Sequence, residues 1–220
     1  LCCAPVAAEP ALWKASDADS DVWLFGSIHA LDADTAWQSE LLMQAVSEAD
    51  YFYYEIPGGP QTEPVMAEQL SAHGLVPQGT TLSRMLNDSQ KATFDRVAEK
   101  MGLSRRQLDP YMPWLAYVTI AVTQIQQAGY SPDSGVDTTM QALTDDTQER
   151  YLETIPQQVG FFAGMPLDLQ IDLLMTSLEQ IEQDPGMLDL MITAWKEGDA
   201  EQLDIIVNQS LAELNDKVYQ

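Results

Sequence analysis

The sequence predicts a mixed α/β protein of the α+β kind, in which a small mixed sheet begins with a strand–helix–strand unit and carries a large helical insertion. Short runs rich in β-formers at 11–16 and 22–28 flank the polar turn D-A-D-S-D, which indicates a hairpin. Apolar residues at helical spacing over 37–49 precede Y-F-Y-Y-E-I-P, whose aromatic residues indicate a strand over 51–56. Strand, helix and strand in this order predict a parallel pair joined by a right-handed crossover.

The helical insertion is expected over about residues 60–130, because helical patterns replace strand patterns after Gly58-Gly59. Asn87 and Gln90 have the spacing of a capping box at a helix N-terminus, and Pro113 begins an apolar helix. A strand predicted at 150–154 is expected to return to the first sheet. Further helices are expected over 136–144 and from 166 to the end, with breaks at 184–186 and 198–199.

The composition limits the class of partner. A chain of 220 residues that is 45% hydrophobic can bury one sizeable core, so we expect a single domain over 9–220. Its 10 Lys and Arg against 34 Asp and Glu give a net charge of -24, which argues against binding to nucleic acid or anionic membranes. Residues 111–132 are uncharged, but Thr and Gln interrupt them, so we expect no transmembrane span. The expected partner is a peptide or small-molecule substrate, and the oligomeric state stays open.

The N-terminal segment L-C-C-A-P-V-A-A has the composition of the end of a signal peptide. It is apolar and ends in small residues that fit a cleavage pattern. We therefore expect residues 1–8 to be a signal-peptide remnant and the protein to be exported, to the periplasm or outside the cell. A disordered terminus is the alternative. The only cysteines, Cys2 and Cys3, are adjacent, which argues against a disulfide framework in the globular part.

His29 follows the apolar run 22–25 in V-W-L-F-G-S-I-H-A-L. Ligands of open α/β sheets bind beyond the carboxyl ends of the strands. Gly26 would permit a tight turn and the close approach of a ligand, which makes His29 a candidate metal ligand or catalytic residue. The alternative is a histidine that only hydrogen-bonds a loop.

Three carboxylates are candidates for the same site. Glu55 ends the apolar run Y-F-Y-Y, where burying an isolated carboxylate would be costly. If the two strands are neighbours, His29 and Glu55 leave one sheet edge as a pair suited to a divalent metal or to acid–base catalysis. Glu55 could instead end the strand and face water. Glu153 repeats the pattern after R-Y-L, whereas Asp137 could simply stabilise a helix N-terminus.

Five ordered segments together resemble one known family. They are P-A-L-W-K-A-S with V-W-L-F-G-S-I-H-A-L, A-V-S-E-A-D-Y-F-Y-Y-E-I, D-P-Y-M-P-W-L-A, G-Y-S-P-D-S-G-V-D and Y-L-E-T-I-P-Q-Q. The first segment contains G-x-x-H, a signature of that family, at Gly26 and His29. The last segment has Gln157 at a position where members of that family usually have a glutamate. These segments resemble the TraB/GumN family, which includes the Tiki metalloproteases, over essentially the whole chain.

The resemblance implies the architecture of Tiki, TraB and haem-uptake-like proteins and a metal-dependent hydrolase, in particular a peptidase. His29 and Glu55 would bind a divalent metal (Zn, Mn or Co) and, with Glu153, would be catalytic. Gly26, Asp137 and Gln158 would face the substrate or support the ligands. The family has a second G-x-x-H in a C-terminal strand that this sequence lacks, so we expect a fragment truncated at its C-terminus.

Two other functions remain open from the sequence. The first is a non-catalytic module that binds haem or a peptide, with His29 as a single axial ligand to haem. The second is a partner-binding protein in which the site is vestigial. Carboxylates clustered around His29 would favour the hydrolase, whereas an open apolar pocket around it would favour the binding module.

Overall fold

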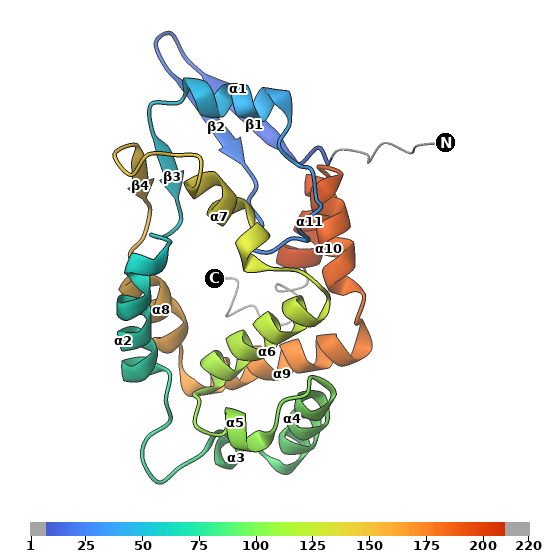
Figure 1. Cartoon of the computed structure of the whole chain (residues 1–220). Helices are drawn as coiled ribbons and strands as arrows, with labels where there is room; N and C mark the ends of the chain where they lie inside the picture. The colour runs from blue at the N-terminus through green and yellow to red at the C-terminus, as the bar shows by residue number, and fades with distance from the viewer. Residues whose placement is uncertain (1–7, 210–220) are drawn as a thin grey trace. The chain divides into compact units, whose positions relative to one another are not determined.

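The computed structural model of the protein describes residues 8–209 (Figure 1). The expected signal-peptide remnant falls almost entirely outside these residues. The chain forms two compact units, each built from segments that are distant in sequence. The first unit contains the residues up to Phe52, Gly129–Arg150 and the residues from Gly186 on, and the second contains Tyr53–Ala128 and Tyr151–Pro185. The predicted insertion at about 60–130 falls mainly in the second unit.

The first unit begins with the predicted hairpin. Strands β1 (Leu12–Ser16) and β2 (Asp21–Phe25) pair antiparallel, with Leu12 opposite Phe25. The helices of this unit are α1 (Glu40–Glu48), α7 (Val136–Gln141), α10 (Met187–Lys196) and α11 (Ala200–Asp204), with a 3-10 turn at Pro132–Ser134 and a π-helical turn at Ile205–Gln209.

The second unit is helical. Its helices are α2 (Glu63–His73), α3 (Leu82–Met85), α4 (Asp88–Lys100), α5 (Arg105–Leu108), α6 (Pro113–Gln127), α8 (Ile155–Ala163) and α9 (Leu167–Gln183), with a 3-10 turn at Pro60–Thr62. Strands β3 (Phe52–Tyr54) and β4 (Glu149–Tyr151) pair with each other, and the boundary between the two units falls within both strands.

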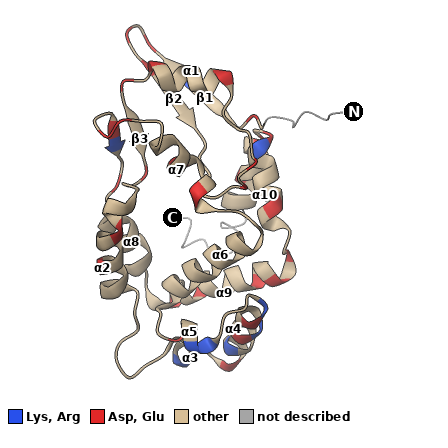
Figure 2. Cartoon of the chain, in the orientation of Figure 1, with Lys and Arg blue, Asp and Glu red and all other residues tan. Residues whose placement is uncertain are grey.

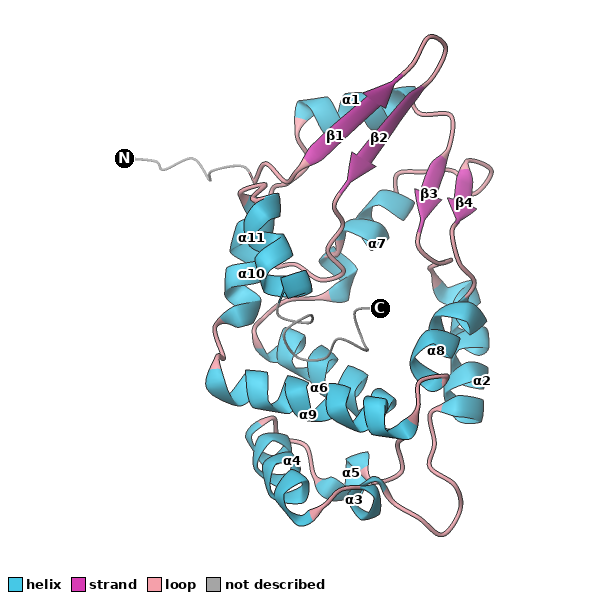
Figure 3. Cartoon of the chain, turned by 180° about the vertical axis from the view of Figure 1, so that it is seen from behind, coloured by secondary structure: helices cyan, strands magenta, loops and turns pink. Residues whose placement is uncertain are grey.

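The mixed α/β class is confirmed, but the predicted single sheet is wrong for the strands that the structure describes. These strands form two separate pairs, β1 with β2 and β3 with β4 (Figure 3). Among residues 8–209, the predicted parallel pairing of β2 with β3 is therefore absent. A short turn closes the hairpin at little entropic cost, whereas an irregular segment over 26–39 separates β2 from α1. The return of β4 is confirmed only as far as its pairing with β3.

Several local signals in the sequence are confirmed. Asn87 and Gln90 form the predicted capping box at the start of α4, and Pro113 is the first residue of α6. Gly102 follows the end of α4 with φ at 67°, a left-handed conformation that favours glycine. The elements are shorter than predicted at their ends: the helix predicted to reach residue 144 ends at Gln141.

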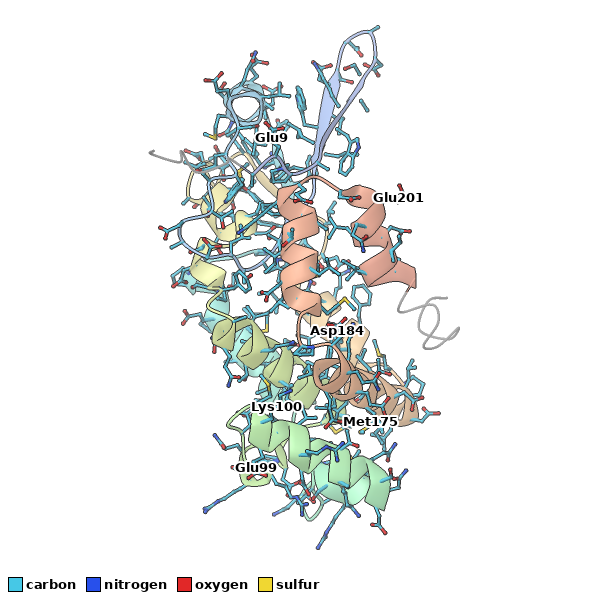
Figure 4. All side chains as sticks on the ribbon, turned by 90° about the vertical axis from the view of Figure 1, so that its right-hand side faces the viewer. Glu9, Glu99, Lys100, Met175, Asp184 and Glu201 are labelled. Atoms are coloured by element: carbon cyan, nitrogen blue, oxygen red, sulfur yellow. The ribbon has the colours of Figure 1, made fainter. Side chains whose placement is uncertain are left out.

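Each unit has its own apolar core. In the first unit the rings of Phe25, Trp37 and Trp195 pack with centroids 5.8–6.4 Å apart. In the second unit α9 packs against α4 and α6, with Phe94, Ile120 and Leu174 fully buried. Figure 4 shows this packing, with Met175 labelled on α9 and Lys100 at the end of α4.

A further core cluster of the second unit lies where α6 meets α8. It contains the buried residues Trp114, Leu115, Ile155 and Val159.

None of the helices within the described part of the chain combines the length and the hydropathy that crossing a bilayer requires.

We expect Asn87→Ala to lower the free energy of unfolding by about 1 kcal/mol, because it removes the side-chain acceptor of the Gln90 N–H at 3.0 Å. Urea denaturation followed by circular dichroism measures this change. The matched control is Ser89→Ala, an exposed position in the first turn of the same helix, which should change the free energy by less than about 0.5 kcal/mol. Equal effects of the two substitutions would contradict a stabilising capping box.

Candidate functional site

The loop that carries His29 is held against the segment preceding α7, within the first unit. Leu31 and Ser131 exchange two backbone hydrogen bonds of 3.2 and 2.8 Å. The N–H of Val136 donates to the carbonyl oxygen of Ile28 at 2.9 Å. These bonds fix the backbone on both sides of His29 and place the first turn of α7 beside it.

His29 and Asp137 form a hydrogen-bonded pair. The Nδ1 atom of His29 lies 2.9 Å from Oδ2 of Asp137, and the exposed fractions of the two side chains are 73% and 28%. Burial by itself would raise the pKa of Asp137, but the hydrogen bond and charge of His29, with smaller contributions from backbone and Ser27 hydrogen bonds, hold that pKa below its usual value. An ionised Asp137 accepts a hydrogen bond from the Nδ1–H of His29, which keeps that proton on Nδ1 and makes Nε2 the nitrogen that could ligate a metal or transfer a proton.

Gly135 is required by space at this pair. Its backbone conformation is extended, with φ at -61°, but a Cβ atom would overlap the carbonyl group of His29, with the carbonyl carbon at 2.7 Å. The carbonyl oxygen of Pro132 would be 3.1 Å from the same atom. Any larger residue would therefore push the His29 loop away from the start of α7.

The structure shows no tight turn at Gly26, although a glycine would permit one. Gly26 does not have a left-handed backbone, and a Cβ atom there would meet no other atom within 4 Å. Its carbonyl oxygen instead accepts a hydrogen bond of 2.8 Å from Nε1 of Trp195 on α10. The glycine of G-x-x-H therefore anchors the loop through its backbone, in a conformation that other residues can also adopt. Its predicted role toward substrate stays a prediction.

In the second unit, the structure brings Glu55 and Gln158 together. Glu55 follows β3, and Gln158 lies in the first turns of α8, where its amide Nε2 donates to Oε1 of Glu55 at 2.6 Å. The N–H of Glu153 donates to the carbonyl oxygen of Glu55 at 2.9 Å, so the two glutamates are joined through their backbones. The hydrogen bond from Gln158 orients one carboxylate oxygen of Glu55.

Gln157 has a structural role at the start of α8. Thr154 is the N-cap of α8, and Gln157 completes a capping box, in which its Oε1 accepts from the Thr154 N–H at 2.8 Å. Glutamine and glutamate both serve at this position of a capping box. The T-x-x-Q spacing of Thr154 and Gln157 could have predicted this capping box from the sequence.

Glu153 has a buried oxygen. Its Oε2 is buried and makes no hydrogen bond within the described residues. A buried, unpaired carboxylate oxygen carries a desolvation penalty that a cation or a donor group of a ligand would relieve. This oxygen is the feature of Glu153 that a cation or a ligand donor could satisfy.

The donor types present suit a divalent metal. The carboxylate on Nδ1 of His29 is the arrangement that commonly orients a metal-ligating histidine, and Glu153 has a buried oxygen with no hydrogen-bond partner in the described part of the chain. His29 and Asp137 belong to the first unit, whereas Glu55, Glu153 and Gln158 belong to the second. Within residues 8–209, no group of three His, Cys, Asp or Glu residues that could hold a metal ion is found. A ligand set of His29 and Glu55 takes one residue from each unit and stays a prediction.

We expect Gly135→Ala to break the His29–Asp137 pair and to lower the free energy of unfolding by about 1–3 kcal/mol, as overpacking commonly does. The imidazole ¹⁵N spectrum reports the pair, because Asp137 fixes the proton on Nδ1. The matched control is Gly26→Ala, where the Cβ position is open and the spectrum should not change. An unchanged spectrum in Gly135→Ala would contradict the spatial requirement.

The comparisons with known proteins agree with the resemblance seen in the sequence. The model of the TraB/PrgY/gumN family matches residues 11–220. No curated protein and no solved structure matches the chain. The match covers nearly the whole chain, including both pairs of candidate residues, and the chain therefore belongs to the TraB/PrgY/gumN family.

Proposed function

We propose that the protein is an exported, metal-dependent hydrolase whose substrate is a peptide. The observation that carries the proposal is the hydrogen bond of 2.9 Å between Asp137 and Nδ1 of His29. A histidine that only braces a loop does not need an ionised carboxylate on one nitrogen and a largely exposed ring. A ligating or proton-transferring histidine does, because the carboxylate sets the tautomer and raises the basicity of Nε2.

The residues have distinct roles in this proposal. His29, through Nε2, and Glu55 would hold a divalent metal, which would supply a Lewis acid that activates water near neutral pH. Asp137 orients the imidazole, and Gln158 orients the carboxylate of Glu55. Glu153 would accept a proton or receive a donor group of the substrate at its buried oxygen.

The exposure of His29 also favours the hydrolase over a haem-binding module. The imidazole side chain is 73% exposed. A single axial haem ligand would be expected in an apolar pocket instead. Export rests on the composition of residues 1–8 alone and is part of the same proposal.

The test is metal binding by the full chain, measured by calorimetry with Zn²⁺, Mn²⁺ and Co²⁺. We expect His29→Ala and Glu55→Gln to abolish binding, because each removes one proposed ligand. Asp137→Asn should weaken binding by about 10- to 100-fold, which is typical when the partner of a ligating histidine is lost. A peptidase screen with the metal that binds would then test the reaction.

The matched control is His73→Ala, which replaces the only other histidine, an exposed residue at the end of α2. It should bind metal as the wild type does. Equal binding by wild type and His29→Ala would place the metal elsewhere and contradict the proposal. Absence of binding by the wild type would leave a ligand-binding module as the better account.

A further inference from the structure

The positive charge of the protein is concentrated in one part of the second unit. Residues 82–109 contain six of the ten Lys and Arg of the chain, but only four of its 34 Asp and Glu. Figure 2 shows these basic residues on α3, α4 and α5. In a chain with a net charge of -24, this segment is the part least repulsive to an anion.

A cavity of about 650 Å³, widely open to solvent, lies beside these basic residues within the second unit. One wall is the loop of residues 75–81, and the other wall contains Arg105, Arg106, Asp109 and Pro110. We call it the 75–81 cavity. Its volume is within the range of about 300–1,000 Å³ that is usual for small-molecule and cofactor sites.

The two walls of the 75–81 cavity are tied together by hydrogen bonds. The N–H of Val76 donates to the carbonyl oxygen of Pro110 at 2.9 Å, and the N–H of Ser83 donates to Oδ1 of Asp109 at 2.9 Å. Arg84 donates to the carbonyl oxygen of Gly79 at 3.0 Å, where φ is 91° and only glycine is unstrained. The loop is therefore fixed before any ligand arrives, which reduces the entropic cost of binding.

The two arginines of the 75–81 cavity differ in their engagement. Arg105 donates to Asp95 through two guanidinium nitrogens, so a carboxylate already balances its charge. Arg106 is exposed, and its side chain makes no hydrogen bond or ion pair that we find within residues 8–209. Asp109 uses one carboxylate oxygen to accept from Ser83. Arg106 is thus the group that could donate to an incoming anion.

The remaining lining residues indicate the rest of the ligand. Leu75, Val76 and the two prolines Pro77 and Pro110 give an apolar surface, and Leu75 is 48% exposed although it is a large aliphatic residue. Gln78, Thr80 and Thr81 add polar side chains to the lining. Apolar side chains, amide groups and one carboxylate occur together at the C-terminal end of a peptide, whereas a fatty acid has no amide groups.

We propose that the 75–81 cavity binds the C-terminal end of an apolar peptide, with the guanidinium of Arg106 donating to the terminal carboxylate. An arginine matches a carboxylate with two parallel N–H donors. This site is separate from the residues of the proposed hydrolase and does not depend on that function.

The test uses N-acetyl-leucyl-leucine, its C-terminal amide and octanoate as probes of the full chain. Dissociation constants are taken from NMR titrations that follow the amide signals of Gly79 and Thr80. We expect the peptide acid to bind at least about tenfold more tightly than its amide, because the amide lacks the charge that Arg106 would bind. The peptide acid should also bind more tightly than octanoate.

Two variants separate direct contact from general charge. Arg106→Gln should weaken binding of the peptide acid by at least about tenfold and leave binding of the amide unchanged. Lys100→Gln removes the same charge from an exposed position outside the lining and should have little effect. Equal binding of acid and amide, tighter binding of octanoate, or an unchanged constant in Arg106→Gln would each overturn the proposal.

Discussion

In the first unit, the candidate site depends on one close contact, in which the backbone of Gly135 approaches the backbone carbonyl of His29. A Cβ atom on Gly135 would overlap the His29 carbonyl, so a glycine is needed for the two segments to meet. Backbone hydrogen bonds from Val136 to Ile28 and between Leu31 and Ser131 then hold them together. His29 and Asp137 are 108 positions apart in the sequence, and this contact brings them within 2.9 Å of each other. The chemistry of the imidazole is therefore a consequence of backbone packing.

In the second unit, a helix N-terminus has the same positioning role. Thr154 and Gln157 satisfy each other's backbone N–H groups and fix where α8 begins. Glu153 directly precedes this cap, and Gln158 directly follows it, with its amide on Glu55. Glutamine at position 157 completes the capping box without adding a third carboxylate beside Glu55 and Glu153. Because Oε2 of Glu153 is already buried and has no partner among residues 8–209, a further negative charge nearby would be unfavourable.

Features that depend on neighbouring residues could be predicted from the sequence. The hairpin of β1 and β2, the capping box at Asn87 and the start of α6 at Pro113 each follow from a few consecutive side chains. The pairing of strands could not be predicted in this way, because β2 and β3 carry apolar patterns that suit several partners. The pairing of β3 with β4 depends on contacts about a hundred residues apart, such as Phe52 with Gln148.

For the candidate site too, the sequence could predict the residue types but not their contacts. His29, Glu55, Asp137, Glu153 and Gln158 could be selected from the sequence, and the structure adds which of them touch. A glycine after a strand suggests a turn, but the backbone of Gly26 does not have a positive φ, so the conformational freedom of glycine does not explain this position. The spatial need at Gly135 had no local signal, because it arises from the distant carbonyl of His29.

The concentration of basic residues on α3, α4 and α5 is not explained by stability. Arg96 is paired with Glu182 at the surface, and Arg105 is paired with Asp95, both with substantial exposure. Exposed ion pairs of this kind contribute only about 0–1 kcal/mol each. Arg106 makes no such pair within the part of the chain that the structure describes, yet it lies beside a fixed, largely apolar cavity. An arginine in that position gains little for folding, and binding an anionic group is the role for which its surroundings are suited.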